Sequence, residues 1–183
     1  PLVNALEAND YAVYDGKQEL KYPVNYSVLN YGNSGFYPTH ENWNKPYSPL
    51  FKFEWKKVYP ALVEAAKVNP IDAYDGVKMR YSNPITGGHV MQTMGASMQL
   101  LPAGFSGKRH RHTGSFVYQV AKGSGYSIIA GKRFDWKTRD IFCVPSWAWH
   151  EHHNASDTED ACLFSFNDLP VIESLGLYQE QAD

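Results

Sequence analysis

The second part of the chain is a series of short strand-like runs, and this pattern restricts the fold more than any other feature. From Val77 onward, β-branched and aromatic residues gather in runs that Gly, Pro and Asn separate. The runs are VKMRYS, TMGASMQLL, SFVYQVAK, YSIIA, DIFCV and ACLFSF. Many short strands at close spacing predict an all-β sandwich or barrel. The segments Gly123–Gly125 and Ala130–Lys132 are candidate hairpin turns, because glycine accepts the positive φ that such turns require.

The first part of the chain lacks this pattern. Residues 1–47 carry Tyr, Asn, Pro and Gly without a sustained period, which predicts an ordered but irregular arm whose aromatic side chains pack on other groups. One helix is predicted within residues 54–68, where Pro60 should kink it or begin its second half. We therefore predict a connecting arm and helix over residues 1–76 and a β domain over residues 77–183, ending in a short helix that starts near Asp168.

Composition and charge exclude several classes of protein. The 183 residues are 43% hydrophobic and carry a net charge of -2, and no basic run is longer than KRHR, so nucleic acid is not expected as a partner. No apolar run approaches the roughly 20 residues that span a bilayer, and no signal peptide is evident. We expect a cytoplasmic protein without membrane contact. Its Cys143 and Cys162 lie in apolar runs and are predicted to be buried, reduced thiols.

The beginning of the chain, PLVNALEAND, has no methionine. This indicates either a processed chain or the back part of a longer one, and the sequence leaves both open.

Three histidines carry the chemistry that the sequence predicts. His110 and His112 are two residues apart, so on a strand both imidazoles project from one face. His150 follows after two candidate turns, which can return an antiparallel strand to the same place in a small barrel. Together they offer three neutral nitrogen ligands to a metal ion, and the alternative is a set of hydrogen-bonded histidines in a metal-free barrel.

These residues resemble the two motifs of the cupin family. Gly104, His110, His112 and Gly123 match the first motif, in which a glycine precedes a His-x-His pair and another glycine follows. The second motif, a proline, a histidine and an asparagine at fixed spacing, is met by Pro145, His150 and Asn154. The resemblance implies an all-β jelly-roll barrel, the cupin fold.

The chain departs from the cupin motifs at several positions. The glutamate ligand that most metal-binding cupins carry would fall at Phe116 or Val117. Two glycines of the second motif are replaced by Arg139 and Trp147. What remains is similar to the cupins with three histidine ligands, in which Fe(II) keeps open positions for a chelating substrate and O2.

A narrower resemblance covers nearly the whole chain. Residues from NPITGGHVMQ to VIESLGLYQEQ, and less strongly the arm, are similar to the carboxy-terminal cupin of the gentisate 1,2-dioxygenases and of the salicylate and 1-hydroxy-2-naphthoate dioxygenases. These enzymes are bicupins. The resemblance implies an Fe(II)-dependent, extradiol-type ring-cleaving dioxygenase that opens a hydroxybenzoate ring with O2, of which this chain is the second half. It also implies an amino-terminal cupin as partner and a homo-oligomeric assembly.

Three further residues are candidates for contact with the aromatic substrate. His152 shares a face with His150 if the strand stays extended, and it could also be a surface or hydrogen-bonded histidine. Gln99 could point into the barrel or be an ordinary polar strand residue. Trp149 could wall the substrate pocket, although core packing is the more frequent use of tryptophan.

The segment HRHTGS predicts a weak activity for this barrel alone. In the amino-terminal cupins of the family, a glutamine that can contact the substrate follows the histidine pair, whereas Gly114 stands here. Two alternatives to a dioxygenase therefore stay open. One is a metal-free or weakly active structural half that supports oligomerisation, and the other is a cupin that binds a small molecule.

Overall fold

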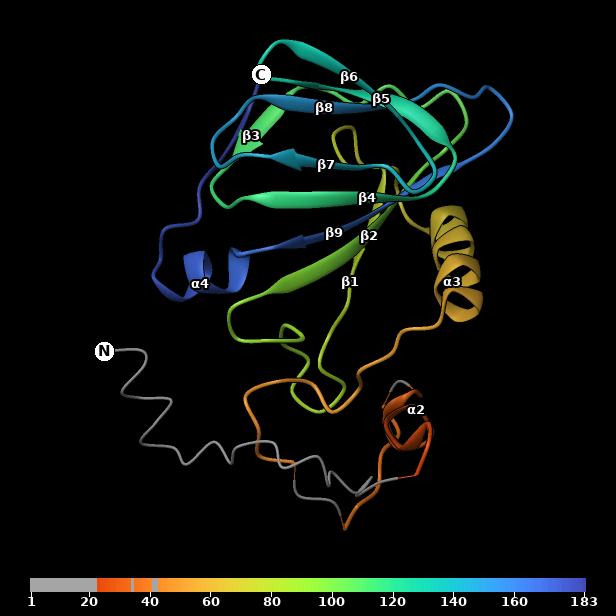
Figure 1. Ribbon diagram of the computed structural model, residues 1–183, viewed down its shortest axis with the longest axis vertical. Helices are drawn as coiled ribbons and strands as arrows, with labels where there is room; N and C mark the ends of the chain where they lie inside the picture. The colour runs from red at the N-terminus through yellow and green to blue at the C-terminus, as the bar shows by residue number, and fades with distance from the viewer. Residues whose placement is uncertain (1–22, 34, 41–42) are drawn as a thin grey trace, which may run out of the picture.

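The computed structural model describes residues 23–33, 35–40 and 43–183, and its strands form two antiparallel sheets that pack face to face (Figure 1). The strands are β1 (Val77–Arg80), β2 (Gly95–Leu101), β3 (His110–His112), β4 (Phe116–Lys122), β5 (Ser124–Ile129), β6 (Lys132–Lys137), β7 (Ile141–Val144), β8 (His150–Asn154), β9 (Ala161–Asn167) and β10 (Glu180–Ala182). One five-stranded sheet has the order β1-β2-β9-β4-β7 and the other β10-β3-β8-β5-β6. The all-β jelly-roll prediction is confirmed.

The hydrophobic core fills the space between the two sheets. Buried side chains from both sheets meet there, among them Leu101 of β2, Tyr118 of β4, Ile129 of β5 and Trp136 of β6. Side chains of a strand point alternately to its two faces. In β4, every second residue from Phe116 to Val120 is therefore buried in this core.

A single helix covers the outer face of the first sheet beside β1 and β2. Helix α3 (Trp55–Val68) places Leu62 in a second apolar cluster with Val77, Met98 and Leu100. The helix runs continuously through Pro60, which confirms the predicted element. Because α3 covers the outer face of β2, that strand is buried on both faces and loses the polar alternation of a half-exposed strand.

The arm before α3 is mostly irregular, and much of the predicted arm, residues 1–22 in particular, lies outside the described residues. A short helix, α2 (Tyr26–Tyr31), interrupts it, so the prediction of an arm without regular elements is wrong there. Its aromatic residues do pack, and Trp43 contacts the rings of Tyr47 and Phe51 with centroids 5.4 and 6.4 Å away. The division of the chain at residue 76 stays a prediction.

The two predicted turns have different outcomes. Ala130 and Gly131 both have positive φ, 49° and 77°, and they join the paired strands β5 and β6 in the two-residue hairpin that the sequence predicts. Gly123 also has a positive φ of 84°, but β4 and β5 lie in different sheets. The predicted hairpin at Gly123–Gly125 is therefore wrong, and this glycine forms the corner at which the chain crosses between sheets.

The terminal helix and the two cysteines are also predicted from the sequence. The predicted terminal helix is present as α4 (Leu169–Ser174). Both cysteines are free thiols, and Cys162 is buried, but Cys143 is exposed because it lies on the uncovered outer face of β7.

Within the described ranges, no helix is both long and apolar enough to cross a membrane.

Candidate metal centre

The three predicted histidines meet on the inner side of the second sheet. Alternation places His110 and His112 on one face of β3, and His110 is the register partner of His150 on the neighbouring strand β8. The ring centroid of His150 lies 4.3 Å from that of His110 and 4.8 Å from that of His112. The sequence brings these residues together because two short strands of one barrel become neighbours.

The nitrogen atoms of this triad fit a metal ion. One ring nitrogen from each of the three histidines lies within 4.8 Å of the others, and all three residues are buried. Nδ1 of His110, both ring nitrogens of His112 and Nε2 of His150 have no hydrogen-bond partner in the protein. Buried polar atoms rarely stay without a partner, so this cluster indicates a ligand for its lone pairs.

One backbone carbonyl fixes how His150 presents its nitrogen. Nδ1 of His150 donates to the carbonyl oxygen of Ala148 over 2.9 Å. A carbonyl can only accept, so Nδ1 carries the proton and Nε2 keeps its lone pair toward the triad. This is the arrangement that orients a metal-ligating histidine.

Burial keeps His112 and His150 uncharged at neutral pH. Desolvation is the largest cause that lowers the pKa of His112 to about 4, and the charges of Lys78 and His110 lower it further. Desolvation likewise lowers the pKa of His150 to about 3. Neutral imidazole is the form that binds a metal ion.

The loop before His150 packs directly on the strand that holds the other two ligands. The backbone N–H of Trp147 donates to the carbonyl oxygen of His112 over 2.8 Å. Trp147 has a positive φ of 62°, as does Arg139 with 81°, and these are the two positions where the cupin motif has glycine. Both residues thus adopt a left-handed backbone, which glycine takes readily, and they do so at a cost in backbone strain.

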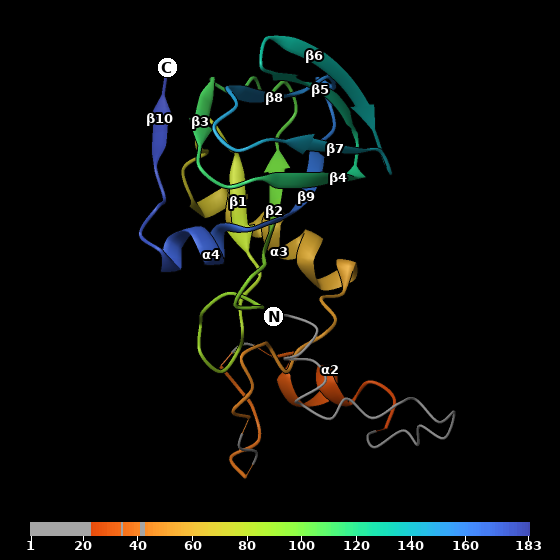
Figure 2. The same cartoon turned by 60° about the vertical axis from the view of Figure 1, so that its left-hand side comes forward.

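The second strand beside the triad comes from the carboxy-terminal tail. Strand β10 pairs with β3 and places Glu180 opposite His112 and Ala182 opposite His110 (Figure 2). The side chain of Arg111 donates to Oε1 of Gln181 at 2.9 and 2.6 Å, which ties the two strands together. The tail therefore holds the strand that carries two of the three ligands.

The three predicted substrate contacts lie in different surroundings. His152 is fully buried, its ring centroid is 5.6 Å from that of His150, and its Nε2 has no protein partner, whereas its Nδ1 is bonded to the hydroxyl of Ser127 at 2.7 Å. Gln99 is fully buried and points inward. Trp149 stacks on Arg109 and Arg111, which alternate with the ligating histidines of β3. The role of all three in substrate binding stays a prediction.

Sequence reasoning missed a charged pair beside the triad. Asp75 accepts from Lys78, with Oδ2 and Nζ 2.9 Å apart, and it also accepts from the side-chain amide of Gln99. Burial opposes ionisation of Asp75, but Lys78, His110 and His152 together lower its pKa to about 2. No motif marks this carboxylate, because it lies in the loop before β1 and reaches the site only through the fold.

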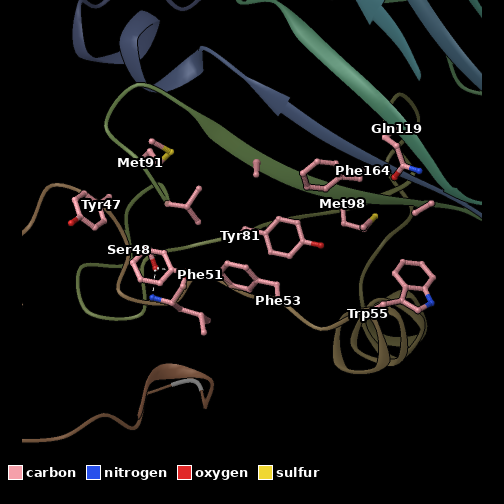
Figure 3. Close-up of a pocket in the computed structure, with 14 residues that line it drawn as sticks. Tyr47, Ser48, Phe51, Phe53, Trp55, Tyr81, Met91, Met98, Gln119 and Phe164 are labelled. Atoms are coloured by element: carbon pink, nitrogen blue, oxygen red, sulfur yellow. Dashed lines mark hydrogen bonds between the residues drawn. The ribbon is translucent and has the colours of Figure 1, made fainter. Parts of the chain in front are cut away.

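A large apolar pocket lies away from the triad. It has a volume of about 670 Å³ on the outer face of the first sheet, between the arm and the strands (Figure 3). Aromatic side chains such as Phe51, Phe53, Tyr81 and Phe164 line it, and none of the three histidines does. This pocket has the character of an uncovered apolar face rather than of a metal site.

Comparison with known proteins agrees with this geometry. The model of the family described as Cupin domain matches residues 97–167, which span β2 to β9 and include the triad. The chain contains a cupin domain.

Its curated relatives are ring-cleaving dioxygenases, as the sequence resemblance predicted. The chain is 36% identical to a 5-aminosalicylate 1,2-dioxygenase of Comamonas sp, over 100% of this chain and 48% of that protein. It is 36% identical to gentisate 1,2 dioxygenase 1 of Aquipseudomonas alcaligenes, over 89% of this chain and 46% of that protein. The chain thus spans about half the length of the curated relatives it matches.

A solved structure shows the same relationship in three dimensions. Salicylate 1,2-dioxygenase from Pseudoaminobacter salicylatoxidans, in a structure with gentisate, matches with a TM-score of 0.77 and 28% identity. The match covers 86% of this chain and 44% of that one. Most of this chain therefore has the fold of somewhat less than half of that dioxygenase.

Proposed function

We propose that this chain is the carboxy-terminal cupin half of a gentisate-type dioxygenase and that His110, His112 and His150 hold Fe(II). The observation that carries the proposal is the convergence of three buried histidines whose facing nitrogens have no protein partner. Three neutral nitrogen ligands leave open positions and the full charge of the ion, which suits an anionic chelate. The names of the curated relatives support an aromatic hydroxy acid as substrate.

Bound Fe(II) would supply one site at which the carboxylate and ortho hydroxyl of a 2-hydroxybenzoate and O2 are held together. The protein supplies the frame for that ion. The Ala148 carbonyl orients His150, and the Trp147 N–H fixes the strand end at His112. Phe116 is one of the two positions at which the glutamate of other cupins would fall. Its ring centroid lies 4.6 Å from that of His112, and its apolar ring excludes water from that side.

Half of each curated relative has no counterpart in this chain, which supports a second cupin half as its partner. Gly114 also supports the need for a second cupin half. Its φ is 95°, and a Cβ built there would lie 2.8 Å from Cδ2 of Leu169. A glutamine at this position would be strained by the positive φ and would push the Leu169 side chain aside. With glycine here, the barrel lacks one amide that could orient a substrate. We expect low turnover from this barrel alone.

Oxygen consumption decides the proposal. The chain is loaded with Fe(II), alone and co-expressed with an amino-terminal cupin half, and oxygen uptake is measured with gentisate, salicylate and 1-hydroxy-2-naphthoate. Uptake that depends on this triad, shown by its loss in His150→Ala, supports the proposal. If His150→Ala leaves both turnover and iron content unchanged, the triad is not the site of the reaction.

A second candidate is a structural half without metal, and the uncovered apolar face around Phe51 and Phe164 favours it. Iron content separates the two candidates before any activity is measured. A chain that purifies and reconstitutes with less than about one ion in ten copies supports the structural role.

A further inference from the structure

A second pocket lies beside the metal centre, and two cationic side chains are among the residues that line it. Its volume is about 260 Å³, and its lining includes Lys78, Arg80, His89, Ser97 and Phe116. Phe116 also contacts the triad, since its ring centroid lies 4.6 Å from that of His112. The pocket therefore adjoins the metal centre through one shared side chain.

The strand β1 points both of its cations into this pocket. Lys78 and Arg80 are two residues apart on one face, and their register partners on β2 are the buried Gln99 and Ser97. Nζ of Lys78 lies 5.4 Å from the centroid of the Phe116 ring. Both cations therefore face the same space as the apolar ring.

The acidic groups nearby leave one cation without a carboxylate. Asp75 pairs with Lys78 at 2.9 Å, and Glu173 pairs with His89 at 2.8 Å. Arg80 donates to the carbonyl oxygen of Gly87 over 3.4 Å, and across residues 23–33, 35–40 and 43–183 it forms no ion pair. A guanidinium has five donors and an ammonium three, so each keeps donors for a ligand.

We propose that this pocket binds the carboxylate of an aromatic acid, with Arg80 and Lys78 as its anchors and the Phe116 ring as a wall for the arene. The inference rests on the proposed function and assigns the residues that anchor the substrate carboxylate at the same site. A carboxylate has two oxygens, so one can accept from these cations while the other stays available to the metal ion. Asp75 acts as a positioning residue, because it holds the flexible Lys78 side chain at the pocket.

The test uses a ligand that cannot chelate a metal. Benzoate has the carboxylate and the ring but no ortho hydroxyl, and benzamide is its neutral analogue of the same shape. The affinity of the metal-free chain for each is measured by ligand-observed NMR titration at low ionic strength. We expect benzoate to bind at least about tenfold more tightly than benzamide, because hydrogen bonds to charged groups are stronger than neutral ones.

Paired variants locate the binding. K78M/R80M should lose the preference for benzoate, whereas K78R/R80K, which keeps both charges, should retain most of it. K67M is the matched control, because Lys67 forms a similar ion pair with Glu64 at 2.6 Å on the exposed side of α3. Thermal melts of each variant confirm that the barrel is folded. Equal benzoate affinity in K78M/R80M and the original chain would overturn the proposal.

Failure of this inference is distinguishable from failure of the proposed function. If benzoate binds through Lys78 and Arg80 but the iron-loaded chain consumes no oxygen with gentisate, the anion pocket stands and the dioxygenase function fails. If oxygen is consumed and KM does not change in K78M/R80M, the function stands and the anion pocket is refuted.

Discussion

His110 and His150 face each other as the register partners of strands β3 and β8, with ring centroids 4.3 Å apart. The metal centre thus depends on strand register as well as on the presence of three histidines. A slip of one residue along β8 would replace His150 by Trp149 or Glu151 and turn the imidazole to the other face. The contacts that fix this strand register are therefore as important for metal binding as the three ligands.

Loss of any one of the three ligands should abolish tight metal binding. We expect His110→Ala, His112→Ala and His150→Ala each to weaken Co(II) affinity by more than the roughly 10- to 100-fold that loss of an outer-shell partner costs. Titration followed by the visible spectrum of Co(II) measures this. His40→Ala, at an exposed position in the arm, is the control and should bind as the original chain does. Unchanged affinity in any single ligand variant would contradict the assignment of that ligand.

Removal of the tail should weaken metal binding without unfolding the barrel. A chain that ends after Gly176 lacks β10, which pairs along the whole of β3, while the buried core between the sheets is kept. We expect a loss of roughly tenfold in Co(II) affinity. Without β10, the strand β3 that carries two ligands is more mobile, and it loses conformational entropy when the metal ion binds. Glu180→Gln keeps the strand and is the control. An unchanged affinity after truncation would show that β3 is held by β8 alone.

The ion pair of Asp75 should make stability depend on acid pH. Its pKa in the folded protein is about 2, below the ordinary 3.8, so ionised Asp75 stabilises the native state above pH 4 and this contribution is lost as the pH falls toward 2. Asp75→Asn should therefore lower the free energy of unfolding at pH 7 by about 2 kcal/mol, with a smaller difference from the original chain at pH 3.

Urea denaturation at both pH values measures this difference. Asp135→Asn removes an exposed carboxylate that pairs with Arg133, and as a control it should leave stability nearly unchanged at either pH. A difference for Asp75→Asn that is the same at pH 7 and pH 3 would refute the role of its ionisation.

Replacement of Arg139 by glycine should stabilise the protein. Arg139 is exposed and has a φ of 81°. This conformation destabilises the folded state of a residue with a side chain by about 1 kcal/mol or more. Glycine removes this strain, but its more flexible unfolded state offsets part of the gain. We expect a gain of about 0.5 kcal/mol in the free energy of unfolding. Gly123→Ala should do the opposite, because its Cβ would lie 2.9 Å from the Cα of Ala161. Thermal melts of both variants test the pair.

The outer face of the first sheet should mediate self-association. Ile141 and Phe51 are 68% and 69% exposed, and Phe166 lies on the same side of the sheet at 38%. Large uncovered apolar patches mark interfaces in soluble proteins. We expect Phe51→Lys combined with Ile141→Lys to lower the molecular mass in sedimentation by at least half. Leu177→Lys, at an exposed position near the tail, is the control. A monomer before any substitution would contradict this prediction.

The sequence predicts much of the barrel and the whole histidine triad, because both depend on local patterns. Six strand-like runs of apolar residues correspond to observed strands, and the two cupin motifs place His110, His112 and His150. Strands β6 and β10 are not predictable in this way. In β6 only Trp136 is buried, and β10 is exposed at every position, so neither shows hydrophobic alternation.

The charged groups around the triad could not be predicted either. Asp75, Lys78 and Arg80 reach the site from β1 and the loop before it, and the antiparallel pairing that brings them there is a property of the whole barrel. Gly123 illustrates the same limit. A glycine indicates that the backbone turns sharply, but it does not indicate which sheet the next strand joins.

The left-handed backbone at Trp147 affects how members of this group of proteins can be recognised. A tryptophan here takes a left-handed backbone, which is a conformation that favours glycine. Its ring stacks on Arg111, with 4.5 Å between the guanidinium carbon and the ring centroid. A sequence pattern that demands glycine there would reject this chain. Patterns built on backbone conformation and on the histidine spacing would accept it, and they would also detect other barrels in which an aromatic residue has taken the place of glycine.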